Sequence, residues 1–249
     1  MAYTMPGVEL TDPMHLEGWE EQDEPLATDR HGEELAYCWT ALRYLLNPDG
    51  HYVSKDRWLR MDRANDRDKL LPDLLIALGV QERQWNVDEY LPWEVGKPPE
   101  VLAEFLSSSS IKADTVEKPK RYGALGVREY FLFDPDGSYA VPRLQGWTLP
   151  GEQQRVPLPR GGDGSVASRV VPVRFVLTDD DHIGVVDERT GELALRYEEL
   201  QRQLREEFLA QQRRQTEAAA REERLQDEVH RLQAELDRLR RERDERGPR

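Results

Sequence analysis

Thiols and membrane-spanning segments are scarce in this chain of 249 residues. Cys38 is the single cysteine, which excludes an intramolecular disulfide and a metal cage built from thiolates. Because its neighbours Tyr37 and Trp39 are aromatic, we expect a buried, unreactive thiol. No run of about 18 apolar residues is present, and residues 1–7 lack the segments of a secretory signal. We therefore expect a cytoplasmic protein without a membrane partner.

The motifs of several common enzyme classes are also missing. The sequence contains no phosphate-binding P-loop, dinucleotide fingerprint or serine elbow. Its five histidines are scattered and lack the spacing of metal ligands, which argues against a histidine general base; they are His15, His31, His51, His182 and His230.

Basic residues are fewer than acidic ones, and the formal net charge is −14. Residues 1–29 contain eight acidic residues and no lysine or arginine, whereas residues 198–249 contain 14 acidic and 13 basic residues. No segment has the basic character of a strong nonspecific nucleic-acid binder. A metal-dependent nuclease is compatible with this charge, because its site needs carboxylates and the bound cation supplies local positive charge.

Composition divides the chain into three segments. Only 38% of the residues are hydrophobic, which is too few for one core spanning the full length. Residues 1–29 are predicted to be an acidic leader, either poorly ordered or lying over the domain as a strap. Residues 30–196 contain the apolar runs of a folded domain. Residues 197–249 lack Gly and Pro until Gly247, which predicts a long charged helix.

The middle segment predicts an α/β domain. Apolar residues at three- and four-residue spacing indicate a helix over residues 31–47. Buried strands are expected at residues 74–79, 101–106 and 128–133, and a helix between the last two would be a crossover within one sheet. Weaker strands are expected at residues 51–54, 57–61, 139–144, 169–177 and 182–186, with loops at residues 62–69 and 81–99.

The C-terminal helix carries an apolar stripe. Its members, which follow alternating steps of four and three, are Leu225, Val229, Leu232, Leu236 and Leu239. The alternative to a coiled coil is a single solvated helix held by charge pairs. The coiled coil is favoured because the steps fit a period of about 3.5, and it predicts a homodimer formed through residues 200–245.

Two carboxylates stand at the predicted buried strands. Asp73 follows Pro72 at the start of one strand, where the end of a sheet is accessible. Glu104 interrupts the apolar run 101–106, and burying an ionised carboxylate is costly unless it is paired or metal-bound. The alternatives are that Asp73 caps a turn and that strand alternation turns Glu104 to solvent. Together they are candidate ligands of a divalent cation that activates water against a phosphodiester.

Lys118 is the candidate basic partner of these carboxylates. Asp114 and Glu117 have the spacing of a capping box, which places Lys118 about one turn into a helix. From there its ammonium group would orient the attacking water or offset the charge that develops during hydrolysis. The alternative is an ordinary surface lysine.

Pro119 complicates this helix, because proline lacks an N–H group and disfavours helical geometry in the preceding residue. If the helix begins at Pro119 instead, Lys112 or Lys120 would reach the site in place of Lys118. Tyr122 is expected to pack this helix onto the sheet, and its hydroxyl to bond nearby. Ser107 lies in a polar turn that could contact phosphate, although a plain turn is the simpler interpretation.

In this order, the residues resemble the Uma-two family of restriction endonucleases, a branch of the PD-(D/E)XK nuclease superfamily. The resemblance covers about residues 25–190 and is carried by residues 72–73, 104–109, 114–122, 126–130, 134–135 and 142–146. It implies a restriction-endonuclease-like core in which a mixed sheet is flanked by helices. A charged C-terminal helix after the domain is also similar to many members.

The resemblance implies that Asp73 and Glu104 are the acidic ligands of Mg²⁺ or Mn²⁺ and that Lys118 is the third catalytic residue. Leu106 stands where the superfamily usually has a lysine. The resemblance implies that in this family the lysine comes from the helix instead, at the position of Lys118. The implied activity is hydrolysis of DNA phosphodiester bonds. The alternative is a catalytically silent nuclease fold that binds DNA or protein and is dimerised by its coiled coil.

Overall fold

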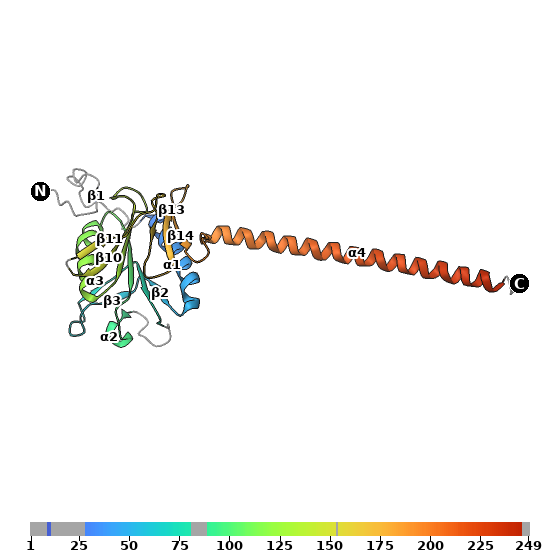
Figure 1. Ribbon diagram of the computed structural model, residues 1–249, viewed down its shortest axis with the longest axis horizontal. Helices are drawn as coiled ribbons and strands as arrows, with labels where there is room; N and C mark the ends of the chain where they lie inside the picture. The colour runs from blue at the N-terminus through green and yellow to red at the C-terminus, as the bar shows by residue number, and fades with distance from the viewer. Residues whose placement is uncertain (1–8, 11–27, 81–88, 153, 246–249) are drawn as a thin grey trace. The chain divides into compact units, whose positions relative to one another are not determined.

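The computed structural model of the chain describes residues 9–10, 28–80, 89–152 and 154–245 (Figure 1). Its main sheet has six strands in the order β11-β10-β8-β7-β5-β2. β7 and β8 are parallel, and the other neighbouring pairs are antiparallel. The predicted mixed sheet and its crossover between β7 and β8 are therefore confirmed. The strands are β2 (Tyr52–Lys55), β5 (Leu74–Ala77), β7 (Val101–Phe105), β8 (Glu129–Phe133), β10 (Leu144–Gly151) and β11 (Gln154–Pro157).

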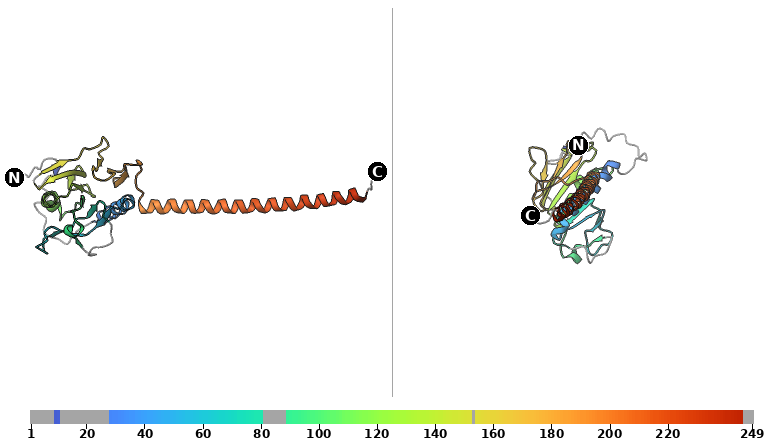
Figure 2. Two further views of the ribbon diagram at one scale, coloured as in Figure 1. Left: turned by 60° about the horizontal axis from the view of Figure 1, so that its bottom comes forward. Right: turned by 90° about the vertical axis from the view of Figure 1, so that its right-hand side faces the viewer.

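Helices cover both faces of this sheet (Figures 1 and 2). α1 (Asp29–Leu46) lies on one face and α3 (Lys118–Leu125) on the other. α1 forms where the apolar spacing predicted a helix, and the Thr28 hydroxyl caps it by accepting a hydrogen bond from the His31 N–H at 3.1 Å. The helix ends at a turn in which Gly50 has a φ of 75°, a conformation that glycine adopts without strain.

Smaller sheets complete the first unit, Met1–Ala194. Part of the loop expected at residues 81–99 lies outside the described residues, and the rest contains a strand and a short helix. Strands of two or three residues are too short to show periodicity in the sequence, which is why most of them escaped prediction. One three-stranded sheet contains β12 (Val166–Ala167), β13 (Val173–Leu177) and β14 (Ile183–Asp187), and another contains β3 (Trp58–Arg60), β4 (Lys69–Leu70) and β6 (Glu89–Tyr90). The short helix is α2 (Pro92–Val95).

The sequence did not predict β11, and of β10 it predicted only the first residue, Leu144. Gly146 and Pro150 interrupt the pattern of β10 in the sequence. The structure shows why glycine is required at position 146, which pairs with Phe131 of β8. A Cβ atom on Gly146 would lie 2.9 Å from the Phe131 ring. Pairing between neighbouring strands thus outweighs the local preference of the residues.

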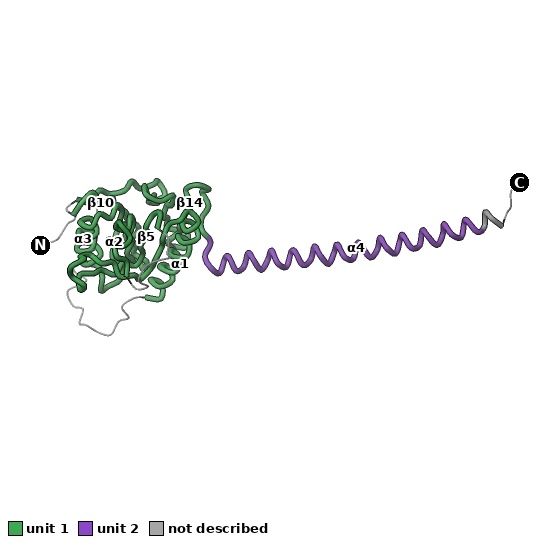
Figure 3. Tube along the Cα trace, turned by 90° about the horizontal axis from the view of Figure 1, so that it is seen from below, with its two compact units in different colours: residues 1–194 green, residues 195–249 purple. Residues whose placement is uncertain are grey.

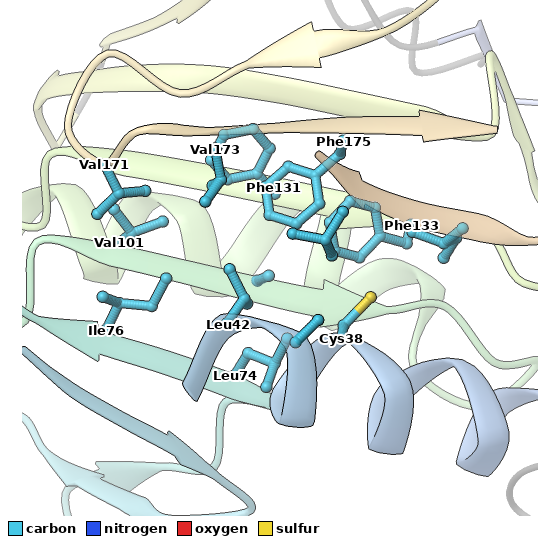
Figure 4. Packing of buried hydrophobic residues seen from close by; sticks show 14 of the residues in the cluster. Cys38, Leu42, Leu74, Ile76, Val101, Phe131, Phe133, Val171, Val173 and Phe175 are labelled. Carbon is cyan, nitrogen blue, oxygen red and sulfur yellow. The ribbon is translucent and has the colours of Figure 1, made fainter. Parts of the chain in front are cut away.

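The two faces of the main sheet have separate cores, because alternate residues of a strand point to opposite faces. The first core lies between the sheet, α1 and the strands β12–β14, and includes Leu42, Phe131 and Phe175 (Figure 4). Cys38 is fully buried in it, as expected for an inert thiol. The second core lies on the α3 face and includes Tyr122.

The second unit, Leu195–Arg249, contains the long helix α4 (Tyr197–Glu245; Figure 3). The predicted C-terminal helix is therefore confirmed. Pairing as a coiled coil stays a prediction. None of the helices in the described residues combines the length and the apolar character needed to cross a bilayer. The stripe residues are about half exposed; they are Leu225, Val229, Leu232, Leu236 and Leu239.

Most of the predicted acidic leader, residues 1–8 and 11–27, lies outside the described residues. The prediction that the leader is poorly ordered or lies over the domain as a strap concerns these same residues. Its residues Glu9–Leu10 form the strand β1, which pairs antiparallel with β9 (Ala140–Val141). The contacts within the chain divide it after Ala194, whereas the sequence places the domain boundary after residue 196.

Candidate active site

Asp73 and Glu104 lie side by side at one end of the main sheet. β5 and β7 are antiparallel, and Leu74 pairs with Ala103. Continuing this register by one residue places Asp73, just before β5, opposite Glu104. The Asp73 N–H donates to Glu104 Oε2 at 3.3 Å, and the Phe105 N–H donates to Asp73 Oδ2 at 2.6 Å. These bonds tie the Glu104 carboxylate to the backbone of Asp73 and the Asp73 carboxylate to the backbone of Phe105, the residue after Glu104.

Strand alternation explains how Glu104 enters the protein interior. Ala103 and Phe105 belong to the first core, while Leu102 belongs to the second core on the α3 face. Glu104 lies between Ala103 and Phe105 and is therefore directed to the α3 face. It is 0% exposed, so the alternative in which it faces solvent is wrong. Both faces of this strand are covered, which periodicity within one strand does not reveal.

Tyr122 of α3 orients this buried carboxylate. Its side chain is fully buried, and its hydroxyl donates a hydrogen bond to Glu104 Oε1 at 2.7 Å. Tyr122 thus packs the helix onto the sheet and bonds nearby, as expected from the sequence. Its contact is with the carboxylate, and direct contact with a substrate stays a prediction.

Lys118 closes the cluster from the beginning of α3. Its ammonium group lies 2.9 Å from Glu104 Oε2 and 2.7 Å from Asp114 Oδ1, and it donates to the Leu71 carbonyl at 3.4 Å. Burial opposes the positive charge, but Glu104 and Asp114 outweigh burial and raise the pKa of Lys118 above its ordinary value. Lys118 therefore stays protonated and supplies a fixed positive charge to the carboxylates.

A π-helical turn (Ala113–Glu117) places Lys118 here and resolves the difficulty posed by Pro119. The Lys118 N–H bonds to the Ala113 carbonyl across this wide turn. Pro119 has no N–H with which to reach the Thr115 carbonyl, and that carbonyl accepts a hydrogen bond from Arg155 at 3.1 Å instead. Wide turns of this kind are frequently found at functional sites.

Asp114 is not the helix cap that its spacing to Glu117 suggested. The capping interpretation is wrong because helical structure already begins at residues 111–112, before Asp114. Asp114 is 1% exposed and is paired with Lys118. The spacing of four residues between Asp114 and Lys118 was the sequence signal for this ion pair.

Burial and mutual repulsion perturb both candidate ligands. Desolvation, followed by the neighbouring Asp73 carboxylate, raises the pKa of Glu104 well above its ordinary value. Desolvation also raises the pKa of Asp73, although the Phe105 N–H and Lys118 act in the opposite direction. The cluster therefore contains more negative charge than it readily accommodates, and an added cation would relieve this repulsion.

His31 of α1 also reaches the site, which the spacing of histidines along the sequence did not reveal. Its Nε2 lies 3.0 Å from the Phe105 carbonyl oxygen and 3.9 Å from Asp73 Oδ2. Its ring also packs edge-on against the Phe105 ring. The N-terminal end of α1 therefore approaches the same two residues that connect the carboxylates.

Comparison with known proteins shows the family of the chain. Residues 14–179, more than half of the chain, match a family described as "Uma2: Putative restriction endonuclease". The chain belongs to the Uma2 family. A crystal structure from Anabaena variabilis ATCC 29413, described as "a putative nuclease belonging to DUF820", is similar with a TM-score of 0.40 and 14% sequence identity, over 59% of this chain and 76% of that one. No curated protein matches the chain.

The remaining predicted residues of this Uma2 protein have other partners or are exposed. Ser107 is half-buried, and its N–H donates to the Ser110 hydroxyl at 3.1 Å. Lys112 lies 3.3 Å from Glu117 and is 84% exposed, and Lys120 is exposed. Lys118, rather than either of these lysines, is the one brought to the carboxylates. Substrate contacts of Ser107, Lys112 and Lys120 stay predictions.

The oxygen donors of this Uma2 site suit a hard divalent cation. No group of three or more His, Cys, Asp and Glu side chains in the described part of the chain forms a ready metal cage. Mg²⁺ does not require one, since it usually takes one or two carboxylates and keeps several waters. Asp73 and Glu104 supply two carboxylates with raised pKa values. These residues therefore fit Mg²⁺ or Mn²⁺.

Proposed function

We propose that this Uma2 protein is a metal-dependent endonuclease that hydrolyses DNA phosphodiester bonds. The observation that carries the proposal is the partly buried Lys118 ammonium group, 2.9 Å from the Glu104 carboxylate, which also accepts a hydrogen bond from the Asp73 N–H. An ammonium group beside neighbouring carboxylates provides the charges that phosphodiester hydrolysis needs. Membership of a family described as restriction endonucleases supports the same reaction class.

Asp73 and Glu104 would hold Mg²⁺ or Mn²⁺ through carboxylate oxygens, together with the Phe105 carbonyl. The bound cation supplies Lewis-acid activation of water and of the scissile phosphate. His31 would steady the Phe105 carbonyl through the contact at 3.0 Å. Tyr122 would keep Glu104 in one orientation through its hydrogen bond at 2.7 Å.

Lys118 would position the attacking water or offset the negative charge that develops on the phosphate. Its pairing with Asp114 at 2.7 Å fixes the ammonium group without occupying Asp73. The raised pKa of Lys118 keeps it charged, so it acts as an electrostatic group and not as a general base. No covalent intermediate on the protein is required.

The direct test is cleavage of duplex and single-stranded DNA by purified protein with Mg²⁺ or Mn²⁺. We expect cleavage by the wild type, abolition by EDTA, and loss of at least about 100-fold in Asp73→Ala and Glu104→Ala. The matched control is Glu129→Gln, which alters another buried carboxylate on β8, bonded to Ser168 and Arg169. Equal residual cleavage by the wild type and both alanine variants would identify a contaminant and reject the proposal.

A catalytically silent binding module is the second candidate, because the ammonium group of Lys118 already neutralises part of the site and the chain carries a net charge of −14. Thermal unfolding separates the two functions. An active metal site gains stability with added Mg²⁺, about 2.7 kcal/mol at a concentration 100 times Kd, and Asp73→Ala removes the gain. Absence of any gain in the wild type favours the silent module.

Under either function we propose that residues 200–245 form a homodimer. The stripe along α4 is apolar and exposed, with Leu232 and Leu236 near its middle, and a coiled coil would cover it. Sedimentation of the full chain should show a dimer, which Leu232→Asp combined with Leu236→Asp converts to a monomer. Gln233→Asp, a change off the stripe, should leave it dimeric. A wild type that is monomeric at all concentrations rejects the dimer.

The cytoplasmic location stays a prediction.

A further inference from the structure

A polar cavity of about 550 Å³ lies at the junction of the main sheet with the small sheet formed by β3, β4 and β6. Residues 54–58 form one wall, and Lys69 and Glu89 form the other. The volume is within the range of small-molecule sites. None of the residues assigned to hydrolysis lines this cavity, so the active site does not account for it.

The cavity combines an accessible aromatic ring with cations. Trp58 is 37% exposed, and the Lys69 ammonium group lies 4.3 Å from the centre of its ring. Lys55 and Arg57 also line the cavity, so three cations face two carboxylates in a chain with a net charge of −14. A partly exposed tryptophan ring in a cavity lined by lysine and arginine has the chemistry that binds a base and its phosphates.

Both carboxylates of the cavity are already paired with cations, one of which, Arg60, lies outside the lining. Glu89 accepts hydrogen bonds from Arg60 at 2.8 Å and from Lys69 at 3.1 Å. Arg60 does not line the cavity and shares Glu89 with Lys69. Lys55 lies 3.5 Å from Asp56, the other carboxylate of the cavity, and the Arg57 guanidinium group lies over the Tyr52 ring. The local field therefore favours an anionic ligand more than the net charge of the protein does.

The cavity borders the carboxylate cluster through the backbone. Asp56, in its wall, donates its N–H to the Asp73 carbonyl at 3.2 Å. Lys69 in the opposite wall belongs to β4, which leads along the chain directly to Asp73. A φ of 49° at Asp56 turns the chain between β2 and β3, so the residues on either side of it reach the same cavity. The cavity therefore adjoins the backbone of one candidate metal ligand, Asp73.

We propose that this cavity binds an unpaired base of a single-stranded nucleic acid by stacking it against Trp58, with the adjoining phosphates beside Lys55 and Arg57. The inference rests on the proposed nuclease function for its biological meaning and adds a substrate class to it: nucleic acid that is single-stranded next to the scissile bond. A continuous duplex keeps its bases paired and does not present one to the ring.

The test measures binding of fluorescein-labelled oligothymidylate to the full chain in EDTA, by fluorescence anisotropy. Stacking contributes strongly to such complexes, so Trp58→Ala should weaken binding about 10-fold or more, and Trp58→Phe should restore most of it. Tyr44→Ala is the matched control, because Tyr44 is an aromatic residue that is 79% exposed on α1 and does not line the cavity. Arg57→Gln should reduce the salt dependence of binding by about one phosphate contact.

Equal affinities of wild type and Trp58→Ala, or no binding of oligothymidylate by the wild type, would overturn the proposal. Duplex DNA bound as tightly as the single strand, with the same loss in Trp58→Ala, would overturn the single-strand assignment. Because EDTA removes the metal, this result is independent of cleavage. A wild type that binds through Trp58 but never cleaves DNA leaves this inference standing while the hydrolase proposal fails.

Discussion

The two faces of the main sheet are both buried, yet they differ in chemistry. On the α1 face the first core is made of apolar side chains such as Phe131 and Phe175. On the α3 face the second core surrounds Glu104 and the hydroxyl of Tyr122. The two faces therefore bury different groups, because strand alternation directs Glu104 to one face and its neighbours Ala103 and Phe105 to the other. Substitutions on the two faces should therefore have separable effects.

Phe131→Ala should have the largest effect on stability. Its ring is fully buried and contacts Phe175 at a centroid distance of 4.8 Å, so its removal leaves a cavity and should cost about 3–5 kcal/mol. Chemical denaturation measures this loss. Below the unfolding transition the stabilisation by Mg²⁺ should persist; its disappearance in a folded variant would contradict the separation of the two faces.

Tyr122→Phe, on the α3 face, should reduce metal affinity more than it reduces stability. Losing the hydrogen bond that orients Glu104 should weaken metal affinity about 10–100-fold, as measured by calorimetric titration with Mn²⁺. Tyr130→Phe is the matched control, since Tyr130 is equally buried but donates to the Asp114 carbonyl at 2.7 Å. Similar metal affinities in the two variants would show that the Tyr122 hydroxyl serves packing only.

Metal binding should depend on pH because the pKa values of Glu104 and Asp73 are raised. At a pH below the raised pKa, a proton occupies the carboxyl group and the metal ion must displace it. Metal affinity should therefore increase with pH, by up to about tenfold per pH unit, or 1.4 kcal/mol, and level off above the raised pKa. The metal-free protein should behave in the opposite way. Its folded state binds the proton more tightly than its unfolded state, so this stabilisation is lost as pH rises through the raised pKa.

Thermal shifts with and without Mg²⁺ across a pH series measure both trends. Glu104→Gln removes the titrating group, so its metal-free stability should vary less with pH than that of the wild type. Metal affinity that is independent of pH in the wild type would contradict a protonated carboxyl group in the cluster.

The smallest effect concerns the backbone beneath the site. In Pro119→Ala the new N–H group becomes available to the Thr115 carbonyl, which in the wild type accepts from Arg155. Arg155→Gln should therefore cost about 0.5–1.5 kcal/mol in the wild-type background and less in the Pro119→Ala background. A double-mutant cycle measures this coupling. Additive costs would show that Arg155 acts through its contact with Trp147 instead.

Much of this fold could be predicted because its signals are local. Apolar residues at helical spacing defined α1, and the absence of Gly and Pro defined α4. β10 could not be predicted, because Gly146 weakens a strand pattern in isolation and is required only by the Phe131 ring of the neighbouring strand.

The same distinction applies to the candidate site. Glu104 could be selected because a carboxylate inside an apolar run needs a partner, and Lys118 lay at a plausible helical position. His31 could not be selected, since nothing in its neighbourhood in the sequence refers to Phe105. Asp114 was assigned to the wrong role because its local spacing satisfied a helix cap equally well.

The amino-acid sequence by itself determined the alternation of β7, the extent of α1 and α4, and the presence of carboxylates that no apolar core would accept without a partner. Only the tertiary structure decided that Glu104 and Asp114 meet at Lys118, and that His31 and Glu104 lie beside Asp73. The physical reason is that local periodicity specifies which side of an element a residue occupies. Which elements face that side depends on strand register and helix packing across the whole domain.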